Sequence, residues 1–98
     1  MPRLLRTEQA QQDLEGILDY LDTQSTEAAD RFADKFDRTC ALYSDHPQMG
    51  TSAEAYATDL RHFTVWNYAI FYRPIAEGIE LIRIIHGARD IPNLFVED

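Results

Sequence analysis

The sequence is poor in cysteine and has no long apolar run. Its single cysteine, Cys40, cannot close an internal disulfide or supply a cysteine-based metal site. No stretch approaches the ~20 consecutive apolar residues that span a bilayer. Residues 1–7 start with a positive charge but lack the apolar region and cleavage site of a signal peptide. We therefore expect a cytoplasmic protein in a reducing compartment, without a membrane partner.

Glycine and proline are also scarce, with four of each among 98 residues, so few turns and long regular elements are expected. Hydrophobic residues make up 45% of the chain, which is enough to build a core and excludes a disordered chain. The length fits one compact domain covering residues 1–98, and no repeat or linker divides it.

Positive charge is scarce as well: 9 basic residues face 17 acidic ones, and only Lys35 is a lysine. The imbalance lies in the first half. Residues 1–59 carry 5 basic and 12 acidic side chains (−7), whereas residues 60–98 carry 4 and 5 (−1). Because nucleic-acid binding depends on a positive field, we expect no direct binding of nucleic acid. A basic protein or peptide fits this charge better.

Two amphipathic helices are predicted in the first half. Thr7 offers an N-cap to the first, Ser25 or Thr26 caps the second, and His46-Pro47 ends it. The apolar stripe of the first helix is Ala10, Leu14, Ile17, Leu18 and Leu21. That of the second is Ala29, Phe32, Ala33, Phe36, Cys40 and Tyr43. Together they form an αα-hairpin with one apolar side.

Four residues of these helices carry separate expectations. Gly16 costs ~1 kcal/mol relative to alanine within a helix, and the close approach of a neighbouring helix would explain it. Tyr20 and Tyr43 are expected to make contacts between the helices or with the sheet. Cys40 is expected to be a core residue and not a nucleophile.

The second half changes to the two-residue period that is typical of strands. After a polar loop at 48–58, strands are expected within 60–66, 68–73 and 79–86. The expected fold is therefore α+β. A short N-terminal strand and the helical hairpin pack on a three- to four-stranded antiparallel sheet.

Turn residues separate these strands. Trp66-Asn67 predicts a tight turn, Pro74 closes the middle strand, and Glu77-Gly78 predicts the next hairpin turn. The order of these signals gives a meander of about three strands, which the N-terminal strand could join.

The last strand, 79–86, is apolar on both faces, as expected of a strand covered on both sides. Only the tail, 89–98, is left to cover the face away from the helices, and Ile91, Leu94 and Phe95 could do so. If the tail leaves that face open, the apolar groove marks a partner site. The pattern leaves both alternatives open.

Several segments closely resemble ParE-type toxins of the ParE/RelE toxin–antitoxin superfamily. In the second half they are Leu60–Phe63, Tyr68–Arg73 and Ile82–Ile91; in the first half they are Asp13–Tyr20 and Leu42–Gly50. The run Ile85-His86-Gly87-Ala88-Arg89-Asp90 is similar to that family's most recognisable signature. The resemblance covers nearly the whole chain.

The resemblance implies a helical hairpin on an antiparallel sheet, without a cofactor. It also implies a hetero-oligomer with a ParD-like antitoxin, whose C-terminal segment wraps the toxin. ParE toxins inhibit DNA gyrase and are not enzymes, whereas RelE-type relatives cut mRNA in the ribosomal A site. A third alternative is a member that still binds antitoxin but has lost toxicity.

The residues present favour gyrase inhibition over RNA cleavage. Attack by a 2′-OH needs a base, an acid and cations for the developing charge. RelE-like relatives supply several lysines and arginines and often a C-terminal tyrosine or histidine. Here the one lysine, Lys35, falls on the polar face of a predicted helix, and no tyrosine follows Tyr72.

The candidate antitoxin- or target-binding residues are Arg61, Arg83, His86, Arg89, Trp66, Leu18 and Phe95. Trp66 either forms part of an interface or packs over the strand ends. His46, His62 and His86 lie on a helix end and two strands without a short ligand spacing, so no metal site is expected.

Two alternatives also remain for the cations of the last strand and tail. Arg83 either pairs with a carboxylate of the helical hairpin or meets acidic antitoxin residues, with its head on the face opposite Ile82 and Ile84. Arg89 and Asp90 either bind a partner or pin the tail to the sheet through a charge-assisted hydrogen bond.

Overall fold

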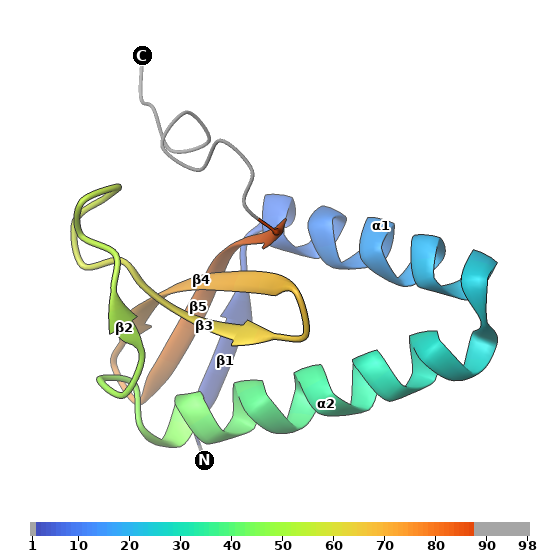
Figure 1. The fold of residues 1–98 in the computed structure, drawn as a ribbon. Helices are drawn as coiled ribbons and strands as arrows, with labels where there is room; N and C mark the ends of the chain where they lie inside the picture. Colours follow the sequence, from blue (N-terminus) through green and yellow to red (C-terminus); the bar gives the residue numbers. More distant parts are fainter. Residues whose placement is uncertain (1, 88–98) are drawn as a thin grey trace.

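The computed structural model describes residues 2–87, in which two helices pack on one face of a five-stranded sheet (Figure 1). The elements are β1 (Arg3–Arg6), α1 (Glu8–Gln24), α2 (Thr26–Asp45), β2 (Thr51–Ser52), β3 (Arg61–Val65), β4 (Tyr68–Ile75) and β5 (Gly78–His86). The α+β class and the order of the predicted elements are confirmed. No helix among the described residues is long and apolar enough to cross a membrane.

The sheet is mixed and has the strand order β1-β5-β4-β3-β2. β3, β4 and β5 pair antiparallel as predicted, and β2, which was expected to be part of a polar loop, adds an antiparallel edge strand and brings the sheet to five strands instead of three or four. β1, however, pairs parallel with β5, with Arg3 opposite Gly78. The expected purely antiparallel sheet is therefore wrong. The direction of β1 depends on where the helical hairpin returns the chain, and a four-residue strand carries no sign of that direction in its sequence.

Side-chain caps fix the two helices where the sequence predicts them. The Thr7 side chain accepts a hydrogen bond from the Ala10 N–H (3.0 Å), and that of Ser25 accepts one from the Ala28 N–H (3.2 Å). Ser25 also ends α1, because its own N–H donates to the Leu21 carbonyl. The helices thus meet at a single shared residue, which fixes the sharp turn of the hairpin.

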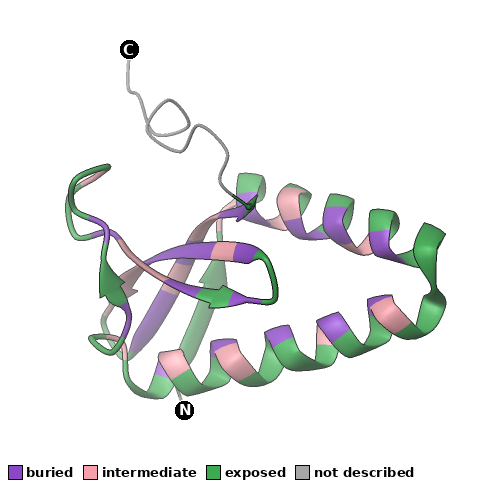
Figure 2. Ribbon diagram, in the orientation of Figure 1, coloured by how far each residue is buried: buried purple, intermediate pink, exposed green. Residues whose placement is uncertain are grey.

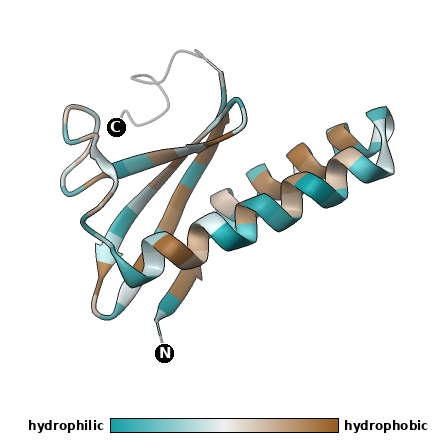
Figure 3. Ribbon diagram, turned by 60° about the horizontal axis from the view of Figure 1, so that its bottom comes forward, coloured by the Kyte–Doolittle hydropathy of each residue, from teal (hydrophilic) through white to brown (hydrophobic). Residues whose placement is uncertain are grey.

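The main core lies between the helical hairpin and the sheet (Figure 2). It contains the helix residues Ala10, Leu14, Ile17, Leu21, Ala29, Phe32, Phe36 and Cys40, and the sheet residues Phe63, Val65, Tyr68, Ile70, Tyr72, Ile79, Leu81 and Ile84. Figure 3 shows apolar and polar bands alternating along both helices, as their predicted stripes require. The predicted contact of Tyr43 is confirmed, since its ring stacks on Phe63 at 4.1 Å between centroids.

A second, smaller cluster occupies the other face of the sheet. Phe71 and Ile85 pack there with Ala53 and Leu60, which come from the segment 51–60. The predicted polar loop is therefore partly apolar and covers this face, with β2 as its hydrogen-bonded edge. The tail residues considered for this role, Ile91, Leu94 and Phe95, lie outside the described residues.

A buried tyrosine joins that segment to the core. The Tyr72 hydroxyl donates to the Pro47 carbonyl (2.7 Å) and accepts from the Gly50 N–H (3.0 Å). A Cβ on Gly50 would lie 2.3 Å from this hydroxyl oxygen, so only glycine leaves room for the contact. The end of α2 is thereby fixed against β4.

Pro74 does not close the middle strand as predicted, because β4 continues to Ile75 and Pro74 pairs with Ile79. The pairing of β3 with β4 stops at Arg61 and Tyr72, so β4 has no neighbour on that side at Pro74. A proline is tolerated where no ladder hydrogen bond is needed. The predicted turn at Glu77 is confirmed, with φ of 65° at that residue.

Candidate functional site

Arg83 is held by a carboxylate of the helical hairpin. Its Nε donates to Oδ2 of Asp13 at 2.9 Å, its Nη2 lies 3.4 Å from Oδ1, and the Ile84 N–H donates to Oδ2 at 3.0 Å. Of the two side chains, Arg83 is 23% and Asp13 11% exposed, so the pair is largely shielded from water. The first of the two alternatives for Arg83 is therefore the observed one.

The predicted direction of the Arg83 side chain assumes that Ile82 and Ile84 share one face of the sheet, and this assumption is wrong. Ile84 belongs to the helix-side core, whereas Ile82 packs against the cluster on the other face. A register shift at Phe71/Tyr72 separates them, since Tyr72 pairs with Leu81 and Phe71 with Arg83. One extra residue in β5 thus breaks the two-residue alternation, so Ile82 and Ile84 do not share a face.

The other described arginines of the second half also bind groups of this chain. Nη1 of Arg61 donates to the carbonyls of Gly50 (2.7 Å) and Gln48 (3.2 Å). Nε of Arg73 donates to the Thr58 carbonyl at 3.2 Å. These arginines hold the segment 48–60 against the sheet, Arg61 through its Nη1.

The histidines are spread over the fold. His86 is exposed and its ring lies 4.8 Å from that of Tyr68, whereas His62 is half-buried beside Phe71 at 5.6 Å. The buried Nδ1 of His62 has no hydrogen-bond partner. Among residues 2–87, no three histidine, cysteine, aspartate or glutamate side chains form a cluster that could hold a metal ion.

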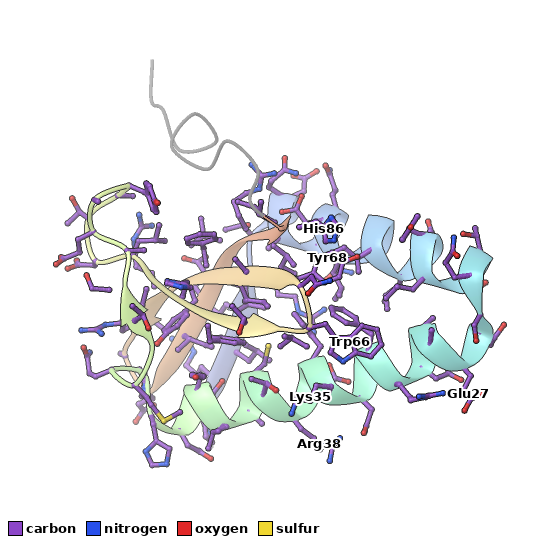
Figure 4. All side chains as sticks on the ribbon, in the orientation of Figure 1. Glu27, Lys35, Arg38, Trp66, Tyr68 and His86 are labelled. Atoms are coloured by element: carbon purple, nitrogen blue, oxygen red, sulfur yellow. The ribbon has the colours of Figure 1, made fainter. Side chains whose placement is uncertain are left out.

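Trp66 forms the tip of the β3–β4 hairpin, as the predicted tight turn requires. It adopts a φ of 54°, which is unusual for a bulky side chain, and remains 48% exposed. Its indole ring contacts Phe32 of α2 in an edge-to-face arrangement, at 5.3 Å between ring centroids. Packing of the ring over the strand end is therefore confirmed, whereas a role of its exposed part in an interface stays a prediction (Figure 4).

The remaining candidates are less accessible or are not described. Leu18 is half-buried against the main core, so its exposed part is small. Arg89 and Phe95 lie outside the described residues, as does Asp90, so their proposed contacts stay predictions. Of the candidates within residues 2–87, His86 and Trp66 are the exposed ones, and Figure 4 shows Tyr68 between them.

Cys40 is fully buried in the main core, as predicted. Burial raises the pKa of its thiol to about 12 from an ordinary value of 9.0. Because the thiolate is the reactive form, we expect iodoacetamide to label the folded chain at least about 100-fold more slowly than the urea-unfolded chain. Between pH 9.0 and about 12 only the unfolded thiol ionises, so the free energy of unfolding should fall as the pH rises through this range. Equal labelling rates in the two states would contradict this assignment.

A hollow of about 650 Å³ lies between α1 and the end of the sheet. We call it the α1–β5 hollow; it is lined by Gln12, Asp13, Gly16, Ile17, Tyr20, Tyr68, Ile84 and His86. The expectation for Gly16 fails here, because no atom approaches within 4 Å of a Cβ built on it. Tyr20 is 59% exposed and lines the hollow together with Tyr68 of the sheet. The sequence signal for this hollow is a glycine on the polar side of a helix, one turn before an aromatic residue.

The comparisons with known proteins agree with this architecture. The family model described as "ParE toxin of type II toxin-antitoxin system, parDE" matches residues 4–91. A solved structure described as "Chromosomal ParDE TA system from P. aeruginosa" has a TM-score of 0.73 and 20% identity. That match covers 89% of this chain and 97% of the other, and at this identity it shows the fold alone. No curated protein matches the sequence.

The fold and the family match therefore lead to the same conclusion. The match includes both helices and all five strands, from residue 4 in β1 to residue 91 beyond β5. The chain belongs to the ParE toxin family of type II toxin–antitoxin systems.

Proposed function

We propose that this ParE-family chain inhibits DNA gyrase by binding it, does not cleave RNA, and is neutralised by a bound ParD-like antitoxin. The observation that favours this mechanism is that the described arginines of the second half are bound to groups of the chain itself. Arg61, Arg73 and Arg83 each bind carbonyl or carboxylate groups of the chain itself. Cations used in this way are poorly placed to stabilise charge on a scissile phosphate.

The other groups that RNA cleavage could use are also separated from one another. Lys35 lies on the outer side of α2, while His86 lies at the end of β5 (Figure 4). The net charge of −8 further opposes docking into ribosomal RNA. An inhibitor that binds a protein target needs neither a general base nor a positive groove.

The exposed surface supports protein partners instead. Its large exposed apolar or aromatic side chains are Leu4, Leu5, Tyr20, Leu42, Met49, Tyr56 and Trp66. Aromatic residues are enriched at protein interfaces, where they contribute much of the binding energy. The solved relative is a ParDE toxin–antitoxin system, which supports a ParD-like antitoxin and a hetero-oligomer for this chain.

The proposal is tested by adding the purified chain, freed of antitoxin, to a gyrase supercoiling assay and to a cell-free translation assay. We expect loss of supercoiling or accumulation of cleaved DNA, with translation and mRNA length unchanged. Arrested translation with shortened mRNA and unaffected gyrase would overturn the proposal in favour of RNA cleavage. Activity in neither assay would overturn it in favour of a member that has lost toxicity.

A further inference from the structure

We propose that the α1–β5 hollow receives the guanidinium group of an arginine carried by the antitoxin. The hollow is open because of Gly16, since any larger side chain at that position would enter it. Its volume of about 650 Å³ exceeds what a single side chain fills, so flanking residues of a bound segment also fit. The site is therefore a docking surface for a peptide.

Aromatic rings form two sides of the hollow. Tyr20 of α1 is 59% exposed, and Tyr68 of β4 lines the opposite side beneath the ring of His86. Burial raises the pKa of Tyr68, and the nearby Tyr20 phenol raises it further, so the Tyr68 ring remains a neutral phenol at the hollow. Figure 4 shows Trp66, Tyr68 and His86 in succession from α2 toward α1. Ring faces attract cations, and arginine also stacks on them.

The charge around the hollow selects a cation over an anion. α1 contains five carboxylates, Glu8, Asp13, Glu15, Asp19 and Asp22, and no lysine, arginine or histidine. Asp13, the one carboxylate among the lining residues, is already paired with Arg83, and Arg6 reaches the start of the helix through Gln11. The other four carboxylates leave α1 as a whole negative, and this charge argues for a basic segment.

Binding of an arginine side chain in the hollow can be tested separately from toxicity. Only the identification of the partner as the antitoxin rests on the proposed function. The probe is a pentapeptide with one arginine between leucines, and its control carries neutral citrulline in place of arginine. Amide shifts of the full ¹⁵N-labelled chain are followed by NMR during each titration. We expect shifts at Gly16, Ile17, Ile84 and His86, with affinity about tenfold lower for the citrulline peptide.

Two variants test whether the peptide binds in the hollow and not elsewhere on the surface. Tyr20→Ala removes one aromatic wall and should weaken the arginine peptide several-fold, because Tyr20 is exposed and its loss spares the core. Tyr20→Phe is the control, because it keeps the aromatic ring and should leave the affinity within about twofold of the wild type. Absence of shifts at the hollow, or equal affinity for both peptides, would overturn the proposal.

Two other occupants would be revealed by the same spectra. If Arg89→Gln alone shifts the amides of the hollow, the chain's own tail fills it and the proposal fails. If those amides shift on dilution without peptide, a second copy fills it and the proposal fails likewise. Where the peptide binds as expected, the cognate antitoxin should bind Tyr20→Ala more weakly than Tyr20→Phe. Equal affinities would overturn the antitoxin as partner, while the gyrase assay would report separately on toxicity.

Discussion

The Gly78→Ala variant is expected to lose about 3 kcal/mol of unfolding free energy. A Cβ at this position would lie 1.9 Å from the carbonyl oxygen of Arg3, which is main chain and cannot rotate away. Arg3 pairs with Gly78 at the start of the parallel β1–β5 ladder, and its N–H donates to the Glu77 carbonyl at 2.7 Å. The added methyl group must therefore push β1 off the sheet.

Chemical denaturation of the variant beside the wild-type chain measures this loss. Gly16→Ala is the matched control, because its methyl group meets no atom within 4 Å. In a helix that substitution should raise stability by about 0.5–1 kcal/mol. Equal stability of Gly78→Ala and the wild type would show that β1 does not pack as described.

Removal of the Asp13 carboxylate should also cause a large loss of unfolding free energy. Asp13→Ala leaves the guanidinium of Arg83 without its partner and the Ile84 N–H without an acceptor. Breaking a shielded ion pair from one side costs more than the pair contributes, so we expect a loss of about 2–4 kcal/mol by thermal or chemical unfolding. The double variant Asp13→Ala/Arg83→Met should recover part of that loss, because no unpaired charge remains.

The exposed pair of Glu27 and Arg31 on α2 gives the control for this prediction. Its two side chains are 74% and 69% exposed at the same 2.9 Å separation. Glu27→Ala should change stability by less than about 1 kcal/mol, since water screens such pairs. A loss for Asp13→Ala no larger than that for Glu27→Ala would contradict the structural role assigned to Asp13.

The helices and their caps were predictable because the signals are local. Thr7 and Ser25 cap within three residues of themselves, and the apolar stripes recur at a fixed period. The strands of the second half follow for the same reason, with the turn at Trp66-Asn67 between two of them. These features need no knowledge of distant partners.

Features that depend on partners far along the chain were not predictable. The parallel direction of β1 and the cover that residues 51–60 give to the second face arise from tertiary contacts. Arg83 illustrates the limit for a site residue. A single register shift in β5 places its neighbours Ile82 and Ile84 on different faces, and the sequence pattern does not predict that shift.

The α1–β5 hollow was missed for a related reason. The helical pattern predicts a close approach between helices at Gly16, whereas this residue faces open space beside Tyr20 and Tyr68. The same glycine fits either arrangement in sequence, and only the placement of α1 against the end of the sheet distinguishes them. His86 and Trp66, by contrast, were identified from sequence and reach the surface at that end.

The most direct test of the account is a titration of gyrase supercoiling with the purified chain, followed by addition of the cognate antitoxin. We predict that activity falls as the chain approaches the gyrase concentration and returns when one equivalent of antitoxin per toxin is added. Reversal by a stoichiometric protein partner is expected of an inhibitor that acts by binding. Gyrase that stays fully active at a large excess of the chain would contradict the account.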